Sequence, residues 1–173
     1  MISLVKPDIR YRTQYIEMIE EWKSFGEKPQ PWVLQADYSD FENLVFKLEQ
    51  ISQGFNIPKG FVPCSTFWAY DNWTNKIVGA VNIRHYLTEA LEKTWGHIGY
   101  GVRPSERRKG YATQILRLAL NECRHLNIKK VLLCCYKHNI ASAKTILKNG
   151  GVLENEVEEE ATGKLIQRYW ISL

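Results

Sequence analysis

The sequence has few cysteines, and none of them is spaced for a metal site or a disulfide framework. Four of the 173 residues are cysteine, and no C-x-x-C pair occurs. They are Cys64, Cys123, Cys134 and Cys135. Cys134 and Cys135 are neighbours in an apolar run, where free cysteine behaves as a small core residue. We therefore expect reduced cysteines and no metal, as in a reducing compartment.

Long apolar runs are also lacking. No stretch approaches the roughly 20 apolar residues that a membrane-spanning helix needs. The N-terminal run Ile2–Val5 is stopped almost at once by Lys6 and Pro7, unlike the apolar core of a secretory signal. Internal repeats and low-complexity segments are absent as well. These absences predict a cytoplasmic protein with no membrane partner.

Neither positive nor negative charge is concentrated in one part of the sequence. The chain has 23 Lys and Arg against 19 Asp and Glu, a net charge of +4. Its longest basic run is the three residues Arg107–Lys109, which is too little to predict a nucleic-acid partner. What remains is an ordinary composition, 45% apolar and 24% charged. At this length it predicts a single globular domain over residues 1–173.

The hydrophobic pattern predicts an α/β fold of the mixed α+β kind, with six or seven strands and about four helices. Expected helices cover residues 10–24, 41–51, 112–123 and 139–147. Expected strands cover residues 2–5, 66–70, 76–85, 97–102, 130–136, 152–160 and 164–173. Three connections remain, over residues 26–37, 54–65 and 86–94, the last with room for a helical turn. In the second, Phe55 and Phe61 are either functional surface aromatics or side chains that pack into the core.

The stretch from Trp95 to Leu126 organises the rest of the chain. A predicted strand leads into Arg107-Arg108-Lys109-Gly110-Tyr111-Ala112, and a helix with one apolar face follows. We call residues 107–113 the glycine turn. Gly110 lets a ligand approach the backbone closely, and the start of a helix offers unpaired N–H groups. The pattern suits a phosphate or pyrophosphate, but a solvated basic surface would carry the same hexapeptide.

The surrounding sequence closely resembles a known family. The strand, Val102-Arg103-Pro104, the glycine turn and the helix after it resemble the acetyl-CoA-binding motif of the GNAT N-acetyltransferase superfamily. A second block, from Asn139 to Lys144 and on to Gly151, resembles that family's next helix. The resemblance covers about residues 66–172 and is closest to bacterial predicted acetyltransferases of unknown substrate. It implies a GNAT-like fold, with a central mixed and largely antiparallel sheet flanked by about four helices.

The resemblance also implies a set of coenzyme-binding residues. Backbone N–H groups of the glycine turn would hold the pyrophosphate of acetyl-CoA. Those residues are Arg107, Arg108, Lys109, Gly110, Tyr111, Ala112 and Thr113. Val102 would bind the pantetheine arm, and an N–H of the same strand would stabilise the oxyanion. Asn139, Ser142 and Lys144 are further candidates, although Asn is also a favoured N-cap residue and the other two suit a solvated face.

The catalytic residues depart from the family pattern. Members commonly place a Tyr seven residues after the Asn, and Ile146 stands there, which cannot donate a proton. The usual positions of a general base are Gly96 and Ile98, which cannot accept one. Tyr100 shares their face of the strand. His97 has a more suitable pKa but faces the other way unless a bulge turns it. We hypothesise that Tyr100 is the acid and an ordered water the base, with His97 as the second catalytic candidate.

These features predict an N-acetyltransferase that moves acetyl from acetyl-CoA to a primary amine by direct attack in a ternary complex. The alternatives are a non-catalytic acyl-CoA-binding protein of the same fold and, more weakly, a basic nucleic-acid-binding domain. We expect a small-molecule or peptide amine as acceptor and no nucleic acid, and the resemblance makes a homodimer a candidate assembly. The acidic residues between 154 and 160 either attract a cationic amine or protect a sheet edge, and we favour the edge.

Overall fold

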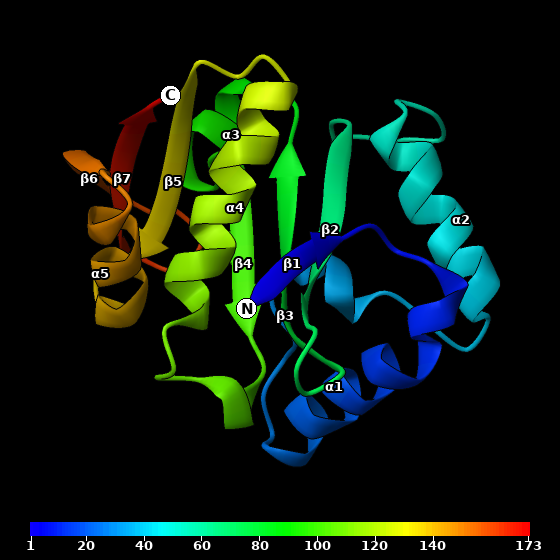
Figure 1. Ribbon diagram of the computed structural model, residues 1–173. Coiled ribbons are helices and arrows are strands. Elements are labelled where there is room, and N and C mark those ends of the chain that lie inside the picture. The colour runs from blue at the N-terminus through cyan, green and yellow to red at the C-terminus, as the bar shows by residue number, and fades with distance from the viewer.

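The computed structural model describes all residues from 1 to 173 (Figure 1). The strands are β1 (Ile2–Val5), β2 (Cys64–Asp71), β3 (Lys76–Arg84), β4 (Ile98–Val102), β5 (Lys130–Tyr136), β6 (Val152–Glu158) and β7 (Leu165–Ser172). The α-helices are α1 (Arg12–Ser24), α2 (Phe41–Ser52), α3 (Glu89–Thr94), α4 (Tyr111–His125) and α5 (Ile140–Lys148). Three short 3-10 helices cover Ile9–Tyr11, Trp32–Gln35 and Pro104–Glu106.

The predicted elements are all present, with boundaries that differ by no more than about two residues, the ordinary uncertainty of helix and strand ends. Two of the expected connections contain short helices. The connection 86–94 contains helix α3, which begins at Thr88, whose side chain accepts a hydrogen bond from Leu91 N. The connection 26–37 contains the short 3-10 helix Trp32–Gln35. No helix is both long and apolar enough to cross a membrane.

The strands form two antiparallel sheets rather than one continuous sheet. The first has the order β1-β2-β3-β4 and the second the order β5-β7-β6. Strands β4 and β5 are neighbours, but only a single bridge joins them, between Gly96 and Leu133. Beside it, His97 N donates to Leu132 O at 2.7 Å. The glycine is required there, because a Cβ on Gly96 would lie 2.5 Å from Leu132 O.

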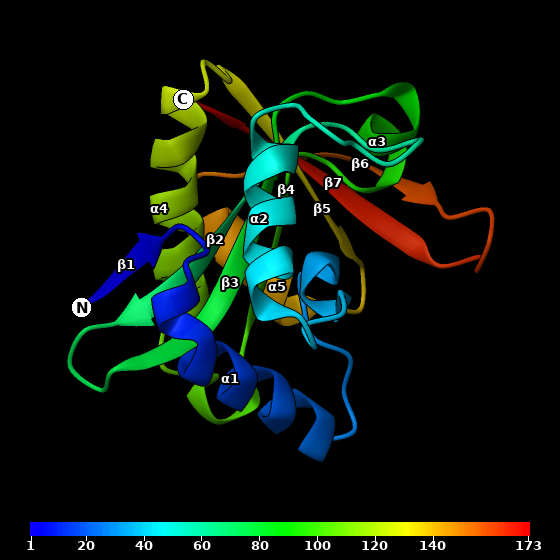
Figure 2. The same ribbon diagram turned by 90° about the vertical axis from the view of Figure 1, so that its right-hand side faces the viewer.

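Helices cover both faces of the first sheet (Figure 2). Helices α1 and α2 pack on one face and α4 on the other. The alternation along β2 follows from this, since successive side chains of a strand point to opposite faces. Trp68 is fully buried with Tyr15 and Phe41 beneath α1 and α2, whereas Phe67 belongs to the larger core around α4. In each core the helices contribute apolar side chains at helical spacing, and the strands contribute the rest.

Strand β6 lies at the edge of the second sheet, and two of its acidic side chains are paired within the protein. Glu156 accepts a hydrogen bond from Lys137 at 2.8 Å, and Glu154 accepts one from Arg168 at 2.6 Å. Charged side chains on an edge strand discourage pairing with another chain. The preferred interpretation, a charged edge, therefore agrees with these contacts.

Candidate functional site

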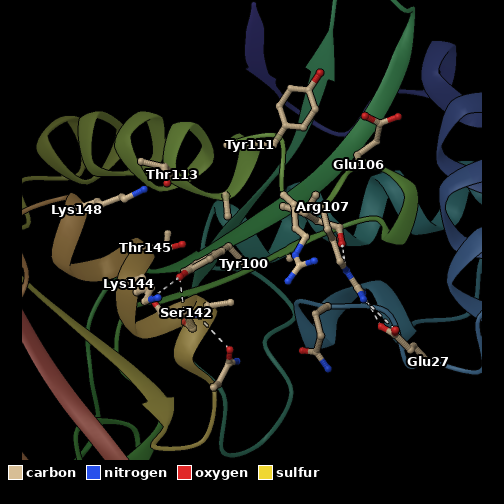
Figure 3. Close-up of a pocket in the computed structure, with 18 of the residues that line it drawn as sticks. Glu27, Tyr100, Glu106, Arg107, Tyr111, Thr113, Ser142, Lys144, Thr145 and Lys148 are labelled. Carbon is tan, nitrogen blue, oxygen red and sulfur yellow. Dashed lines mark hydrogen bonds and ion pairs between the residues drawn. The ribbon is translucent and has the colours of Figure 1, made fainter.

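A cavity of about 840 Å³ lies where β4 ends and α4 begins (Figure 3). Helix α5 forms the opposite wall, and the segment after α1 closes one end. The lining residues are Trp22, Glu27, Gln30, Tyr100, Gly101, Val102, Glu106, Arg107, Arg108, Gly110, Tyr111, Ala112, Thr113, Asn139, Ala141, Ser142, Lys144, Thr145 and Lys148. The structure thus brings together eleven of the thirteen residues predicted for the site and leaves out Lys109 and His97.

The glycine turn presents a run of unused backbone donors to this cavity. The N–H groups of residues 108–113 donate to no backbone or side-chain acceptor within the protein. Gly110 occupies the N-cap position of α4 and supplies no side-chain cap. The backbone is left-handed at Arg108 (φ +62°) and at Gly110 (φ +82°). Successive N–H groups in such a turn, at the start of a helix, form a concave site for an anion.

The space above Gly110 is open. A Cβ added there would have no heavy atom within 4 Å. The glycine is therefore not needed to avoid a clash inside the protein. Its left-handed conformation is one that glycine adopts at no steric cost, and an absent side chain leaves the N–H groups accessible to a ligand.

Side chains of the glycine turn are mostly engaged by other residues. Arg107 makes a two-pronged ion pair with Glu27, at 2.9 Å from Nη1 and 2.5 Å from Nη2, and its Nε donates to Val102 O at 3.2 Å. The hydrogen bonds from Arg107 lower the pKa of the Glu27 carboxyl. Lys109 is turned out of the cavity and pairs with Glu106 at 2.8 Å.

Tyr111 lines the cavity, but its hydroxyl is directed elsewhere. It donates to the buried Asp71 Oδ2 at 2.9 Å, which raises the pKa of Tyr111. The contact ties the first turn of α4 to the end of β2. Tyr111 can therefore offer a ligand its backbone N–H, while its side chain positions the helix.

Three cations in the cavity wall have no ion-pair partner in the protein. Arg108 comes from the glycine turn, and Lys144 and Lys148 come from α5. Sequence reasoning included the first two and missed Lys148. The signal was available, since residues four apart lie on the same face of a helix, and Lys148 follows Lys144 at that spacing. The unpaired charge makes this part of the wall positive.

Helix α5 begins with its donors partly satisfied. Asn139 Oδ1 accepts from Ser142 N at 3.1 Å, so the capping role of Asn139 is formed in the structure. Its side-chain amide donates to no protein group, which leaves it available at the cavity wall. Ile146 is fully buried in the core of the larger cluster. It contributes nothing to the cavity, as expected from its side chain.

Tyr100 reaches α5 from β4. Its hydroxyl lies 3.0 Å from Ser142 Oγ, which connects the two walls of the cavity (Figure 3). Burial raises the pKa of Tyr100 to about 12. The hydroxyl is therefore protonated at neutral pH and can act as a hydrogen donor.

His97 occupies the junction between the sheets rather than the cavity. Its Nδ1 accepts from Leu132 N at 3.0 Å, and its side chain is 8% exposed. Burial, aided by the nearby Arg84, lowers the pKa of His97 to about 4. The ring is neutral and already bonded to the backbone of β5. This geometry corrects the second catalytic candidate, because no bulge turns His97 toward the site and its ring holds β4 against β5.

Besides Lys148, sequence reasoning missed two acidic residues, one on α1 and one in the segment after it. The first is Glu21. It accepts from Arg103 Nε at 2.8 Å and from Ser105 N at 2.8 Å, and so anchors the start of the β4–α4 connection. Burial would raise the pKa of Glu21, but the bonds from Arg103 and Ser105 outweigh it and lower the pKa. The second is Glu27, which pairs with a residue 80 positions away. No local pattern could indicate either contact.

The segment after α1 lies directly against β4. A Cβ on Gly101 would be 2.3 Å from Gln30 O, and one on Gly99 would be 3.3 Å from Pro31 Cβ. Two glycines of β4 therefore allow this segment to form a wall of the cavity. In the same region Trp32 stacks on Phe61 at a centroid distance of 5.3 Å. Phe55 and Phe61 are 59% and 50% exposed, so they do not pack into the core.

Comparison with known proteins gives a family and several solved structures. The family model described as the acetyltransferase (GNAT) family matches residues 16–150. No curated protein matches the chain. The chain is similar to RimL, a ribosomal L7/L12 alpha-N-protein acetyltransferase in complex with coenzyme A, at 16% identity over 99% of this chain and 94% of that chain, with a TM-score of 0.72.

Two other solved structures show the same architecture. The microcin C7 self-immunity acetyltransferase MccE, in complex with acetyl-CoA and AMP, is 19% identical over 99% of this chain and 92% of that one, with a TM-score of 0.68. A spermidine N-acetyltransferase chimera, SpeG from Vibrio cholerae and hSSAT, is 15% identical over 99% and 95%, with a TM-score of 0.66. At such identities the similarity concerns the fold, and it confirms the predicted fold class.

Proposed function

The chain belongs to the acetyltransferase (GNAT) family, and on that premise we propose that it transfers an acetyl group from acetyl-CoA to a primary amine in a ternary complex. The observation that carries the proposal is the run of free N–H groups over residues 108–113, in the wall of a cavity. A helix start without a cap leaves its donors for a ligand, and an anion is the ligand that suits them.

The chemistry of the cavity fits this coenzyme. Its pyrophosphate would accept from the N–H groups of the glycine turn, and the unpaired cations Arg108, Lys144 and Lys148 would lie near its negative charge. The volume of about 840 Å³ is within the range of small-molecule sites. Acetyl-CoA supplies the activated acetyl thioester. The side-chain amide of Asn139 and the backbone of Val102 complete the proposed contacts.

Tyr100 is the proposed proton donor. Its hydroxyl lines the cavity, is held by Ser142 and is protonated at neutral pH, so it can protonate the departing sulfur. It cannot serve as a base for the same reason. The two carboxylates of the cavity wall, Glu27 and Glu106, are both paired with cations. We therefore assign removal of the amine proton to a water molecule.

The acceptor class is proposed from chemistry shared by the similar structures. One of them is a spermidine N-acetyltransferase and another is a ribosomal L7/L12 alpha-N-protein acetyltransferase. Both acceptors are amines, one a small molecule and one a polypeptide. We propose a primary amine of either kind for this chain.

A screen of amines with thiol detection tests the proposal. The purified protein is incubated with acetyl-CoA and, in separate reactions, spermidine and peptides with a free or a blocked N-terminal amine. We expect release of free CoA that depends on the acceptor and is absent with the blocked peptide. Binding of acetyl-CoA by calorimetry, without thiol release for any amine, would instead establish the alternative, an acyl-CoA-binding protein that has lost its chemistry.

A further inference from the structure

Glu27 is a carboxylate in the wall of a cavity that is otherwise suited to anions. It lies in the segment after α1, where its N–H donates to Trp22 O at 3.1 Å. Both of its carboxylate oxygens accept hydrogen bonds from Arg107. With the remaining Nε bonded to Val102 O, the guanidinium group of Arg107 is committed to protein acceptors.

The exposure of this pair argues against a purely stabilising role. The side chains of Arg107 and Glu27 are 41% and 42% exposed. An ion pair open to water to that extent contributes at most about 1 kcal/mol to stability. The pair formed by Arg103 and Glu21 is different, with side chains 8% and 16% exposed and additional bonds to Ser105. Glu21 thus anchors the connection, and Glu27 is free to have another role.

An anion in the cavity would compete with Glu27. Carboxylate and phosphate both accept the two parallel N–H groups of a guanidinium, so either can satisfy Arg107. A phosphate bound to residues 108–113 would lie next to Arg107 and also be repelled by the charge of Glu27. Arg107 therefore has two alternative partners, one from the protein and one from the ligand.

The position of Glu27 in the chain links this competition to the cavity wall that covers β4. Three residues later Gln30 packs over Gly101, and the next residue, Pro31, lies against Gly99. The same segment therefore touches the glycine turn through Glu27 and covers β4 through Gln30 and Pro31. If a phosphate replaced Glu27 as the partner of Arg107, the segment would lose its attachment to the glycine turn and keep only its contacts with β4.

We propose that Glu27 tunes coenzyme binding by competing with phosphate for Arg107, and so couples the wall over β4 to occupancy of the glycine turn. Glu27 is a positioning residue in this arrangement, since it acts through Arg107. The inference rests on the proposed function, because the competing anion is the pyrophosphate of the coenzyme.

Calorimetric titration of coenzyme A into Glu27→Gln tests the inference. Removal of the competing charge should tighten binding about fivefold, which corresponds to a surface ion pair of about 1 kcal/mol. Glu17→Gln is the matched control, because Glu17 is an exposed carboxylate on α1 without a recorded side-chain partner. It should leave the affinity unchanged.

A second pair of variants distinguishes competition for Arg107 from a general effect of the negative charge of Glu27 on coenzyme affinity. In an Arg107→Gln background, Glu27→Gln should have a clearly smaller effect on affinity, because only the direct repulsion between Glu27 and the phosphate is then removed. Unchanged or weaker binding in the single Glu27→Gln variant would overturn the inference, as would an equal gain with and without Arg107. Failure of the proposed function has a different signature, since the unmodified protein would then bind no coenzyme A at all.

Discussion

Helices α4 and α5 both begin at the cavity, and their first N–H groups are in different states. At α5, Asn139 caps the helix through Ser142 N. At α4, Gly110 offers no cap, and the N–H groups through Thr113 have no protein partner. Side-chain caps also begin α2 and α3. Helix α1 has no side-chain cap of its own, but it continues from a 3-10 helix that Asp8 caps. The free N–H groups at α4 lie in the wall of a cavity, which supports our proposal that a ligand takes the place of the cap.

Blocking the uncapped start of α4 should have the largest effect. Gly110→Val places a branched side chain over the free donors and in a left-handed backbone, so we expect coenzyme affinity to fall at least about 100-fold. Gly54→Val is the matched control, since Gly54 is also left-handed (φ +87°) with no heavy atom within 4 Å of a Cβ. Both variants should lose similar stability, about 1–2 kcal/mol. Equal coenzyme binding by both in calorimetry would place the site elsewhere.

The junction between β4 and β5 should make the stability of the protein depend on pH. His97 joins β4 to β5, and its pKa is lowered to about 4 in the folded protein from an ordinary 6.5. Between these values the unfolded chain binds a proton that the folded chain does not, so acid favours unfolding. The free energy of unfolding should fall by about 2 kcal/mol from pH 6.5 to pH 4 through this group.

Urea unfolding at both pH values measures this effect. His97→Asn, whose amide oxygen can still accept from Leu132, should lose that part of the pH dependence and keep acetyl transfer at neutral pH. His125→Asn, at an exposed position on α4, should keep the full dependence. Loss of acetyl transfer in a folded His97→Asn protein would instead support a catalytic role for His97.

Tyr100 connects the wall formed by β4 with the wall formed by α5. Tyr100→Phe removes the hydroxyl bonded to Ser142 but retains the ring. Turnover should fall at least about tenfold, or 1.4 kcal/mol of transition-state stabilisation, with unchanged coenzyme affinity. Ser142→Ala serves as a partner variant, which should have a smaller effect because it leaves the proton in place. Full turnover by Tyr100→Phe would reduce Tyr100 to a packing residue.

The smallest expected effect is at the capped start. Asn139→Asp retains an oxygen for Ser142 N and loses the side-chain amide donors. Coenzyme affinity should fall about threefold, the loss of one modest hydrogen bond, while the thermal midpoint stays the same. Identical affinities measured by calorimetry would leave Asn139 with the capping role alone.

The sequence could predict features that depend on local residue order, but not contacts that depend on how distant elements pack. The glycine turn and the Asn139 block are local patterns, so their strands and helices and the open turn at Gly110 could be predicted from residue order. Glu27 and Gln30 could not be placed in the same cavity, because their contacts depend on how the segment after α1 packs against β4. Lys148 follows Lys144 at helical spacing and could have been added to the candidates. His97 had a suitable pKa in isolation, and only burial at the β4–β5 junction revealed its structural role.

The most direct test of the central claim is an NMR titration of the amide N–H groups with coenzyme A. We expect large shifts for the amides of residues 108–113, which have no protein acceptor, and small ones for Ser142, which is already bonded to Asn139. Binding of coenzyme A with those six amides unmoved would contradict the claim.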